Sequence, residues 1–201
     1  MPSYDRTLTS ARAFAEAGRL EEWIHQYLLT DGNNAPFSEG LKLFPRSYLG
    51  PVDAPLSLFR RCCGPEEGMK WRVHPVHFEN KVQRLMEAAK ADPDLPPLIV
   101  CYRFSEVDGT PEFELNDGNG RYEAYTRLGR THAPVVFWIT EAAELAAWFS
   151  QARESRNVPV DVTPVKQIKK PAGGKPGMVI YHVYNTVYVT PDKDLAEKLR
   201  R

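Results

Sequence analysis

Between two strongly apolar runs, residues 98–102 and 133–139, lies the sequence Asn116-Asp117-Gly118-Asn119-Gly120-Arg121-Tyr122-Glu123-Ala124-Tyr125-Thr126-Arg127-Leu128-Gly129. This pattern predicts a strand, a sharp polar turn and a short helix. Asp117 or Asn119 is the expected N-cap of that helix, and Gly129 is expected just beyond its last turn. Because glycine tolerates positive φ, the turn is expected to leave several backbone amides pointing outward without partners.

Unpaired amides at the start of a helix attract anions. Arg121 lies in or near the first helical turn and adds a permanent, fork-shaped cation that suits a phosphate or carboxylate. Asp117 is a candidate ligand for Mg²⁺, which binds carboxylates together with phosphate oxygens. The stretch therefore predicts a phosphate or nucleotide site at Gly118, Asn119, Gly120 and Arg121. A well-capped connection without a ligand is the alternative.

The composition indicates a globular protein with a neutral surface. The chain has 201 residues, of which 42% are hydrophobic, so it can form one core domain with extensions. Its 26 basic and 26 acidic residues cancel, so any nucleic-acid partner would need a local patch. No signal peptide or membrane span is recognisable, and we expect a cytoplasmic location without a membrane partner. The three cysteines suggest neither a disulfide framework nor zinc.

Residues 1–55 are expected to form a helical N-terminal extension. An apolar stripe with helical spacing supports its second helix and consists of Leu20, Trp23, Ile24, Tyr27 and Leu28. Residues 35–55 contain several prolines and no sustained period, so we expect irregular structure there.

Residues 56–156 are expected to form the core. A helix is predicted over residues 78–89, with a stop at Asp92-Pro93. The apolar run 98–102 suits a strand buried on both faces, and Asp108-Gly109 predicts a hairpin turn after it. With a further strand over 134–139 and a helix after Thr140, the alternation predicts a small α/β (α+β) domain with a mixed sheet. Residues 157–201 are expected to add a basic loop, β-rich structure and a terminal helix.

The central turn and its flanking strands carry a resemblance to a known superfamily. The segments that carry it are Pro97-Leu98-Ile99-Val100, Leu115-Asn116, Asp117-Gly118-Asn119-Gly120-Arg121-Tyr122-Glu123-Ala124, Leu128-Gly129 and Pro134-Val135-Val136. Over roughly residues 56–140 the chain resembles the ParB N-terminal-like/sulfiredoxin superfamily. The resemblance implies that the turn faces a nucleotide. Members include CTP-binding partition proteins, ATP-dependent sulfinic-acid reductases and kinases that act on a free serine hydroxyl.

Departures from these patterns favour the kinase-like branch. Sulfiredoxins carry a cysteine and a histidine before the motif arginine, where this chain has Asn119 and Gly120. Partition proteins carry Glu-Arg-Arg at the turn and continue into a helix-turn-helix domain, which the remaining residues do not resemble. The Asp-Gly opening is similar to the kinase branch. There, Asp117 matches an acidic residue by position, and Glu66 or Glu67 matches a second carboxylate by region only.

The resemblance therefore implies a nucleotide-binding protein that transfers phosphate from ATP to a small hydroxyl compound. Backbone amides and Arg121 would bind the phosphates, Mg²⁺ would lie at Asp117, and Glu66 or Glu67 would act as base. Arg72 precedes the first core helix and is a further candidate for the same cleft. The alternative is a non-catalytic nucleotide-sensing or DNA-associated module. The sequence does not choose the nucleotide, the acceptor or the oligomeric state, and it leaves catalysis itself open.

Other residues have ordinary explanations that we favour over functional ones. His74 and His77 suit a general base but also a solvated helix start. Cys62-Cys63 suits a redox pair, but adjacent thiols in a reducing compartment are mostly unreactive. Arg60-Arg61 and the lysines between residues 166 and 175 suit phosphate contacts with a nucleic acid, yet a solvated surface is the favoured reading at zero net charge.

Overall fold

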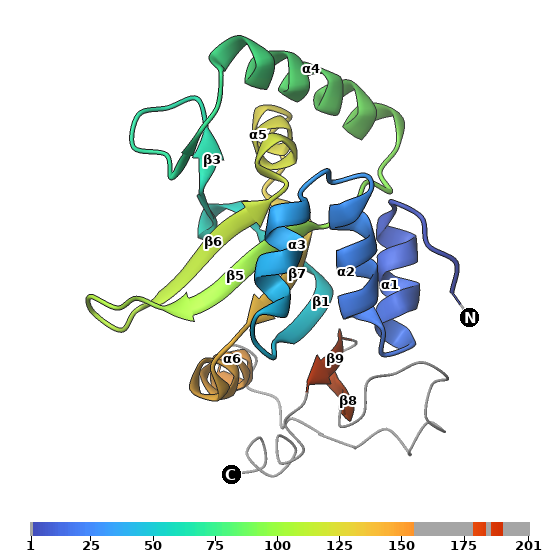
Figure 1. Ribbon diagram of the computed structural model, residues 1–201, viewed down its shortest axis with the longest axis vertical. Coiled ribbons are helices and arrows are strands. Elements are labelled where there is room, and N and C mark those ends of the chain that lie inside the picture. The colour runs from blue at the N-terminus through green and yellow to red at the C-terminus, as the bar shows by residue number, and fades with distance from the viewer. Residues whose placement is uncertain (1, 155–178, 184–185, 191–201) are drawn as a thin grey trace.

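The computed structural model describes residues 2–154, 179–183 and 186–190 (Figure 1). The elements in this part of the chain are, in order, α1 Leu8–Glu16, α2 Leu20–Leu29, α3 Ala35–Lys42, β1 Ser47–Pro55, the short 3-10 helix Leu56–Leu58, β2 Arg60–Arg61, β3 Cys63–Gly64, β4 Trp71–Arg72, α4 Pro75–Ala91, β5 Leu98–Phe104, β6 Pro111–Asp117, α5 Asn119–Arg127, β7 His132–Ile139, α6 Ala142–Glu154, β8 Val179–Val183 and β9 Thr186–Thr190.

The strands build the mixed sheet that the alternating pattern predicts. The order is β2-β6-β5-β7-β1-β9-β8. β5 and β7 are parallel neighbours, whereas β6 runs antiparallel to β5 and β1 runs antiparallel to β7. The chain therefore has an α/β fold. β6 and α5 lie in the connection from β5 to β7. The central turn therefore lies at the end of β6, where the chain leaves the sheet and enters α5 (Figure 1).

Both faces of the sheet are covered, and β5 is buried on both, as predicted. Successive strand residues point to opposite faces. Leu98 and Val100 join a cluster that includes Phe137, Tyr125 of α5 and Leu145 of α6. Ile99 instead joins the cluster formed with α1–α3. The apolar stripe of α2 thus has a direct use, because it covers one face of the sheet.

The expectation of irregular structure over residues 35–55 is wrong, since this segment forms α3 and β1. Pro36 lies in the first turn of α3, where a missing N–H costs nothing. In β1 the pairing with β7 shifts between Leu49 and Val52, so Pro51 falls in a bulge rather than in the regular ladder. The core sheet therefore begins at Ser47, before residue 56, where we expected the core to start.

α4 and α5 cross above the end of the sheet and pack on each other through Phe78, Val82 and Ala124 (Figure 1). The helix predicted over residues 78–89 is confirmed and ends at Ala91, before Asp92-Pro93. The N-cap expectation for α5 is wrong, because the cap is Gly118 and no side chain bonds there. The C-terminal expectation holds, since Gly129 has a φ of 73° just after the last turn.

At the C-terminal side, the expected β-rich structure is present as the antiparallel pair β8 and β9, and β9 also pairs with β1. The expected basic loop over residues 169–177 and the terminal helix lie outside the described residues. None of the helices in the described ranges combines the length and the apolar character needed to cross a membrane.

Candidate functional site

The central turn has the geometry of an open helix start. β6 ends at Asp117, Gly118 adopts a left-handed φ of 94°, and α5 begins at Asn119. No side chain accepts a hydrogen bond from the first-turn amides as a cap. These amides have no partner inside the helix either, because the residues four positions earlier belong to β6 and not to α5. The positive end of α5 is therefore available to a ligand.

A cavity of about 700 Å³ opens in front of this turn. Its walls come from the segment before α1, the end of α2, one side of α4 and the turn itself. The residues that line it are Asp5, Arg6, Thr7, Tyr27, Asp31, Gly32, Lys81, Leu85, Ala88, Ala91, Asp92, Asp94, Leu95, Pro96, Asp117, Gly118, Gly120 and Arg121. This lining includes four of the candidate residues from the sequence, which are Asp117, Gly118, Gly120 and Arg121.

Arg121 is at this cavity but is not a free phosphate-binding fork. Its side chain is 7% exposed, and its Nη2 lies 2.9 Å from Asp117 Oδ2. Nη1 donates a hydrogen bond to Tyr27 Oη (2.6 Å), and Nη2 also donates to the carbonyl of Pro97 (3.4 Å). Only Nε lacks a hydrogen-bond partner among the described residues. Two of its three nitrogens are thus engaged within the protein, and they fix the turn to α2 and β6.

Tyr27 completes this buried cluster. Its hydroxyl accepts from Arg121 and donates to Asp117 Oδ2 (3.3 Å), and its ring stacks on Trp23 with centroids 5.3 Å apart. Burial alone would lower the pKa of Arg121, but the oxygens of Tyr27 and Asp117 raise it above its ordinary value. The guanidinium therefore remains charged. Burial is also the main reason why the pKa of Tyr27 rises to about 12, with Arg121 opposing the change.

The raised pKa of Tyr27 predicts a loss of stability at high pH. The folded state holds the phenolic proton more tightly than the unfolded chain, whose tyrosine pKa is about 10. Its stabilising contribution is complete below pH 10 and is lost as the pH rises towards 12. Denaturant unfolding at pH 9, 10 and 11 measures this loss. Tyr27→Phe is expected to flatten the decline, and an unchanged decline in that variant would contradict the assignment.

Lys81 is a candidate site residue that sequence analysis missed. It projects from α4, and a Cβ placed on Gly120 would lie 3.4 Å from Lys81 Cε. Lys81 is exposed and makes neither a hydrogen bond nor an ion pair with the described residues. The other cations of the cavity lining, Arg6 and Arg121, each have an aspartate partner. No pattern in the sequence distinguishes Lys81 from the other charged residues on the outer face of its helix.

Asn119 has a structural role in this conformation. It is buried, its Oδ1 accepts from the backbone N–H of Cys63 (3.2 Å), and its Nδ2 donates to the carbonyl of Leu115 (3.3 Å). Asn119 thereby ties the β3 segment to the turn. Burial raises the pKa of both Cys62 and Cys63, which favours the inert thiol form over a reactive thiolate.

The structure does not bring Glu66, Glu67 or Arg72 into the cavity lining. Glu66 forms an ion pair with Arg61 and borders a different hollow of about 360 Å³, beside the start of α4. Glu67 is exposed on the same loop. Arg72 is exposed on β4, where its Nε donates to the carbonyl of Pro65 (3.4 Å). The predicted second carboxylate and the predicted extra arginine therefore lie apart from Asp117.

The cavity has opposite charges at its two ends. Lys81 and the α5 N-terminus form a positive end. The lining contains four aspartates other than Asp117, which are Asp5 before α1, Asp31 after α2, and Asp92 and Asp94 after α4. Within the described residues, no three His, Cys, Asp or Glu side chains are grouped to hold a metal ion by themselves. Asp117 retains Oδ1 for such a contact, so Mg²⁺ would fit here as a companion of bound phosphate.

The comparisons with known proteins give short or low-similarity matches. No protein-family model matches the chain. The Rqc2 homolog RqcH of Bacillus subtilis is 49% identical over 72 residues, which are 36% of this chain and 13% of that protein. RqcH of Streptococcus suis is 49% identical over 61 residues. The matched part therefore spans about one eighth of the length of these curated relatives.

Solved structures similar to the chain include a sulfiredoxin from Arabidopsis thaliana, with 30% identity, 43% of this chain and 81% of that chain covered, and a TM-score of 0.31. The chain resembles the ParB N-terminal-like/sulfiredoxin superfamily. ParB from Caulobacter crescentus complexed with CTP-γ-S is 19% identical over 54% of each chain (TM-score 0.33). A free serine kinase in complex with AMP is 13% identical over 79% of this chain and 61% of that chain (TM-score 0.32).

Proposed function

We propose that the cavity binds a nucleotide through its phosphate groups. The observation that carries this proposal is the uncapped first turn of α5, whose two glycines face the cavity while Lys81 lies beside Gly120. Amides at a helix start and an unpaired ammonium group together favour an anion with several acceptor oxygens. The buried pair of Arg121 and Asp117 supports the turn behind them and keeps it in this conformation.

The charge distribution also orients the ligand. The phosphate belongs at the Lys81 end, because the carboxylates of Asp5, Asp31, Asp92 and Asp94 would repel it from the other end. Carboxylates accept hydrogen bonds from ribose hydroxyls and from base amino groups, so the nucleoside belongs on the acidic side. The cavity volume of about 700 Å³ lies within the range of small-molecule sites.

We further infer phosphate transfer from ATP to a small hydroxyl compound as the activity of this site. In that reaction the hydroxyl oxygen bonds to the γ-phosphorus, the bond from that phosphorus to the β,γ-bridging oxygen breaks, and the hydroxyl proton passes to a base. Asp117 would hold Mg²⁺, and the cation would offset the phosphate charge. Glu66 and Glu67, the bases that the resemblance implies, are outside the cavity lining.

Calorimetry with AMP, ADP, ATP and CTP tests the binding step. The wild-type protein is expected to bind at least one of them. Lys81→Ala should weaken that binding about fivefold, because it removes one partly exposed charge contact of about 1 kcal/mol. Lys90→Ala removes a lysine from the same helix outside the cavity lining and should bind like the wild type. Absence of binding at millimolar nucleotide, or equal affinity in Lys81→Ala, would contradict the proposal.

Incubation with ATP, Mg²⁺ and a panel of hydroxyl metabolites tests the transfer step separately. Phosphorylation of one acceptor with release of ADP is expected, and Lys81→Ala should slow it. Binding without turnover of any acceptor would instead favour the alternative function, a nucleotide-sensing module without catalysis.

A further inference from the structure

Trp71 is the feature that the proposed nucleotide site does not use. Its side chain is 63% exposed on β4, whereas Trp23 is fully buried and Trp138 and Trp148 are partly buried in the core clusters. A tryptophan offers a large apolar face that is usually buried, so an exposed one indicates a surface that contacts a partner. The backbone of Trp71 is tied to the β3 segment, because its N–H donates to the carbonyl of Cys62 (2.9 Å).

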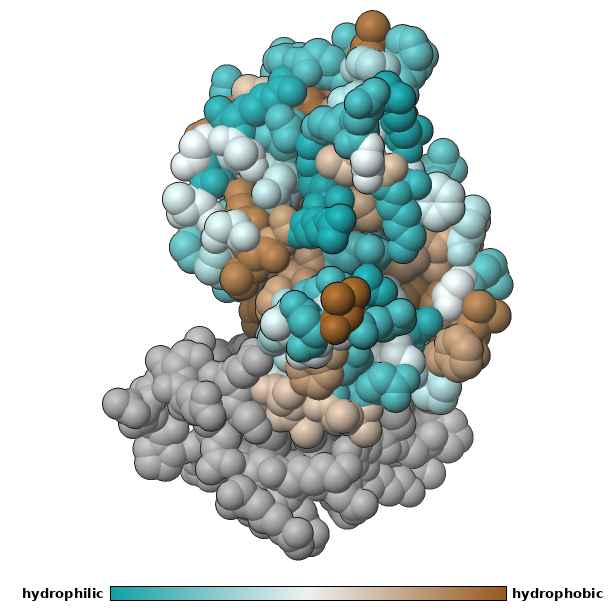
Figure 2. Space-filling view, turned by 90° about the vertical axis from the view of Figure 1, so that its left-hand side faces the viewer, coloured by the Kyte–Doolittle hydropathy of each residue, from teal (hydrophilic) through white to brown (hydrophobic). Residues whose placement is uncertain are grey.

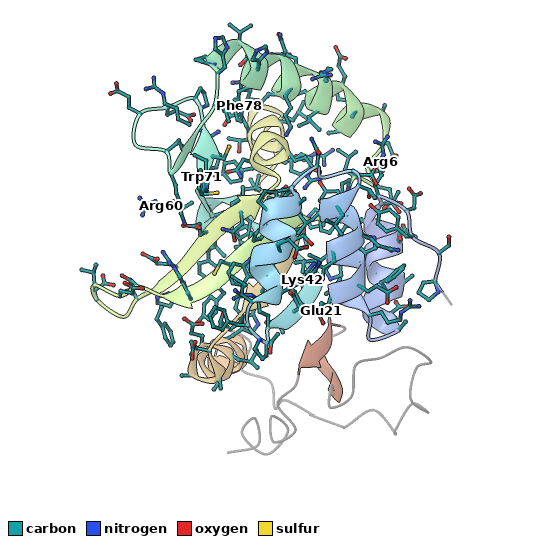
Figure 3. The ribbon with its side chains drawn as sticks, viewed as in Figure 1. Arg6, Glu21, Lys42, Arg60, Trp71 and Phe78 are labelled. Carbon is teal, nitrogen blue, oxygen red and sulfur yellow. The ribbon has the colours of Figure 1, made fainter. Side chains whose placement is uncertain are left out.

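Three cationic residues are close to Trp71, two as its neighbours in the chain and one on the adjoining sheet edge. We call the set Arg60, Lys70, Trp71 and Arg72 the basic aromatic strip. Arg60 on β2 pairs with Glu114 of β6 in the sheet register. Lys70 Nζ lies 3.3 Å from a carboxylate oxygen of the same glutamate. Arg60 and Lys70 are therefore both close to Glu114 at the edge of the sheet. Figure 3 shows Arg60 and Trp71 on the same side of the molecule, away from α1 and α2.

The strip has an excess of positive charge despite the neutral chain. Arg60 and Arg72 make no ion pair with the described residues. The nearby carboxylates of Glu66 and Glu114 are occupied by Arg61 and Lys70, which leaves Glu67 as the exposed acid of the same loop. The side of the molecule that carries β3 and this loop faces the viewer in Figure 2, and its upper part is mainly hydrophilic.

The start of α4 adds to the positive charge near the basic aromatic strip. Its N-terminal end follows β4 directly and carries the positive end of a 17-residue helix dipole. His74 and His77 are exposed there, with ring centroids 4.9 Å apart. This surface combines an exposed ring with two exposed arginines that form no ion pair with the described residues, near a positive helix end. A single nucleic-acid strand requires these two elements, a stacking face and phosphate-binding cations.

We propose that the basic aromatic strip binds single-stranded nucleic acid, with a base stacked on Trp71 and the adjacent phosphates at Arg60 and Arg72. A single strand fits better than a duplex, because its bases are free to stack on a side chain that lies at the surface. This surface is separate from the cavity lining, so the proposal does not depend on nucleotide binding by α5.

The test uses the full chain and fluorescently labelled oligouridine and oligothymidine of about ten nucleotides at low salt. Binding should quench the emission of the exposed tryptophan and raise the anisotropy of the label. Trp71→Ala should weaken binding about tenfold, the effect of losing one stacked base. Arg60→Ala/Arg72→Ala should reduce the slope of log affinity against log salt by about 1.4, since each lost phosphate contact contributes about 0.7.

Matched controls test whether the effect belongs to this surface or follows from the loss of any exposed ring or any cation. Phe44→Ala removes another exposed ring, and Lys42→Ala/Lys90→Ala removes two cations elsewhere. Both controls should bind the oligonucleotides like the wild type. The proposal is overturned if the wild type binds neither oligonucleotide, if Trp71→Ala binds as tightly as the wild type, or if a duplex or an acidic phosphopeptide displaces the strand from the strip at equal concentration.

Discussion

Replacing Asp117 with alanine is expected to lower the free energy of unfolding by about 3–5 kcal/mol. The change strands the guanidinium of Arg121, which is 7% exposed, beside an apolar methyl group. Tyr27 and the carbonyl of Pro97 remain as its partners, but neither carries a compensating charge. Chemical denaturation at neutral pH measures the loss. The same variant should also bind nucleotide more weakly, because the ion pair supports the turn that faces the ligand.

A second substitution separates the cost of a stranded charge from the loss of a contact. Asp117→Ala/Arg121→Met replaces the pair by apolar groups and should be less destabilised than Asp117→Ala alone, because no buried charge is left uncompensated. Glu39→Ala breaks an exposed ion pair with Lys42 and should leave the unfolding midpoint unchanged within error. The loss in free energy of unfolding could instead equal the sum of the losses in Asp117→Ala and Arg121→Met. In that case Arg121 would not depend on Asp117 for neutralisation.

Replacing Gly118 with alanine is expected to destabilise the protein by about 2–5 kcal/mol. A left-handed φ of 94° costs an L-residue about 1–2 kcal/mol. In addition, the new Cβ would lie 2.6 Å from Leu98 Cδ2 and 2.9 Å from Arg121 Nη2, and crowding of a packed core costs about 1–3 kcal/mol. Because the clash is with Arg121 itself, nucleotide binding should fall as well.

Gly129 provides the matched control for this prediction. It also has a positive φ, 73°, but a Cβ placed there would meet no atom within 4 Å. Gly129→Ala should therefore cost only the backbone strain of about 1–2 kcal/mol and leave nucleotide affinity unchanged. Thermal or denaturant unfolding of the two variants gives the comparison. Equal losses would mean that the surroundings of Gly118 contribute nothing beyond its conformation.

Local patterns predicted much of the fold because their physical causes are local. The spacing of Leu20, Trp23 and Tyr27 requires only that one helical face be buried, and α2 follows it. The run 98–102 requires burial on both sides, and β5 has it. The same reasoning failed over residues 35–55. Prolines there disfavour a regular strand, but pairing with β7 and a bulge at Pro51 accommodate them, and neither is visible in the local sequence.

The candidate site shows the same division between local and distant causes. Residues near the turn were predicted from their types, and Gly118 and Gly120 do face the cavity. The state of Arg121 was not predictable, because its partner Tyr27 is 94 positions away and was taken only for a core residue of α2. Lys81 was missed for a similar reason, since only the packing of α4 on α5 brings it beside Gly120.

The sequence by itself determined the mixed α/β fold, the strand–turn–helix at residues 116–129 and the need for glycine in that turn, because periodicity and backbone conformation depend on neighbours in the chain. The tertiary structure alone decided which charges are free. It joined Arg121 to Asp117 and Tyr27, left Lys81 at the cavity without a partner among the described residues, and placed Glu66 at another hollow. Charge pairing depends on distances of a few ångströms between distant segments, and only packing sets those distances.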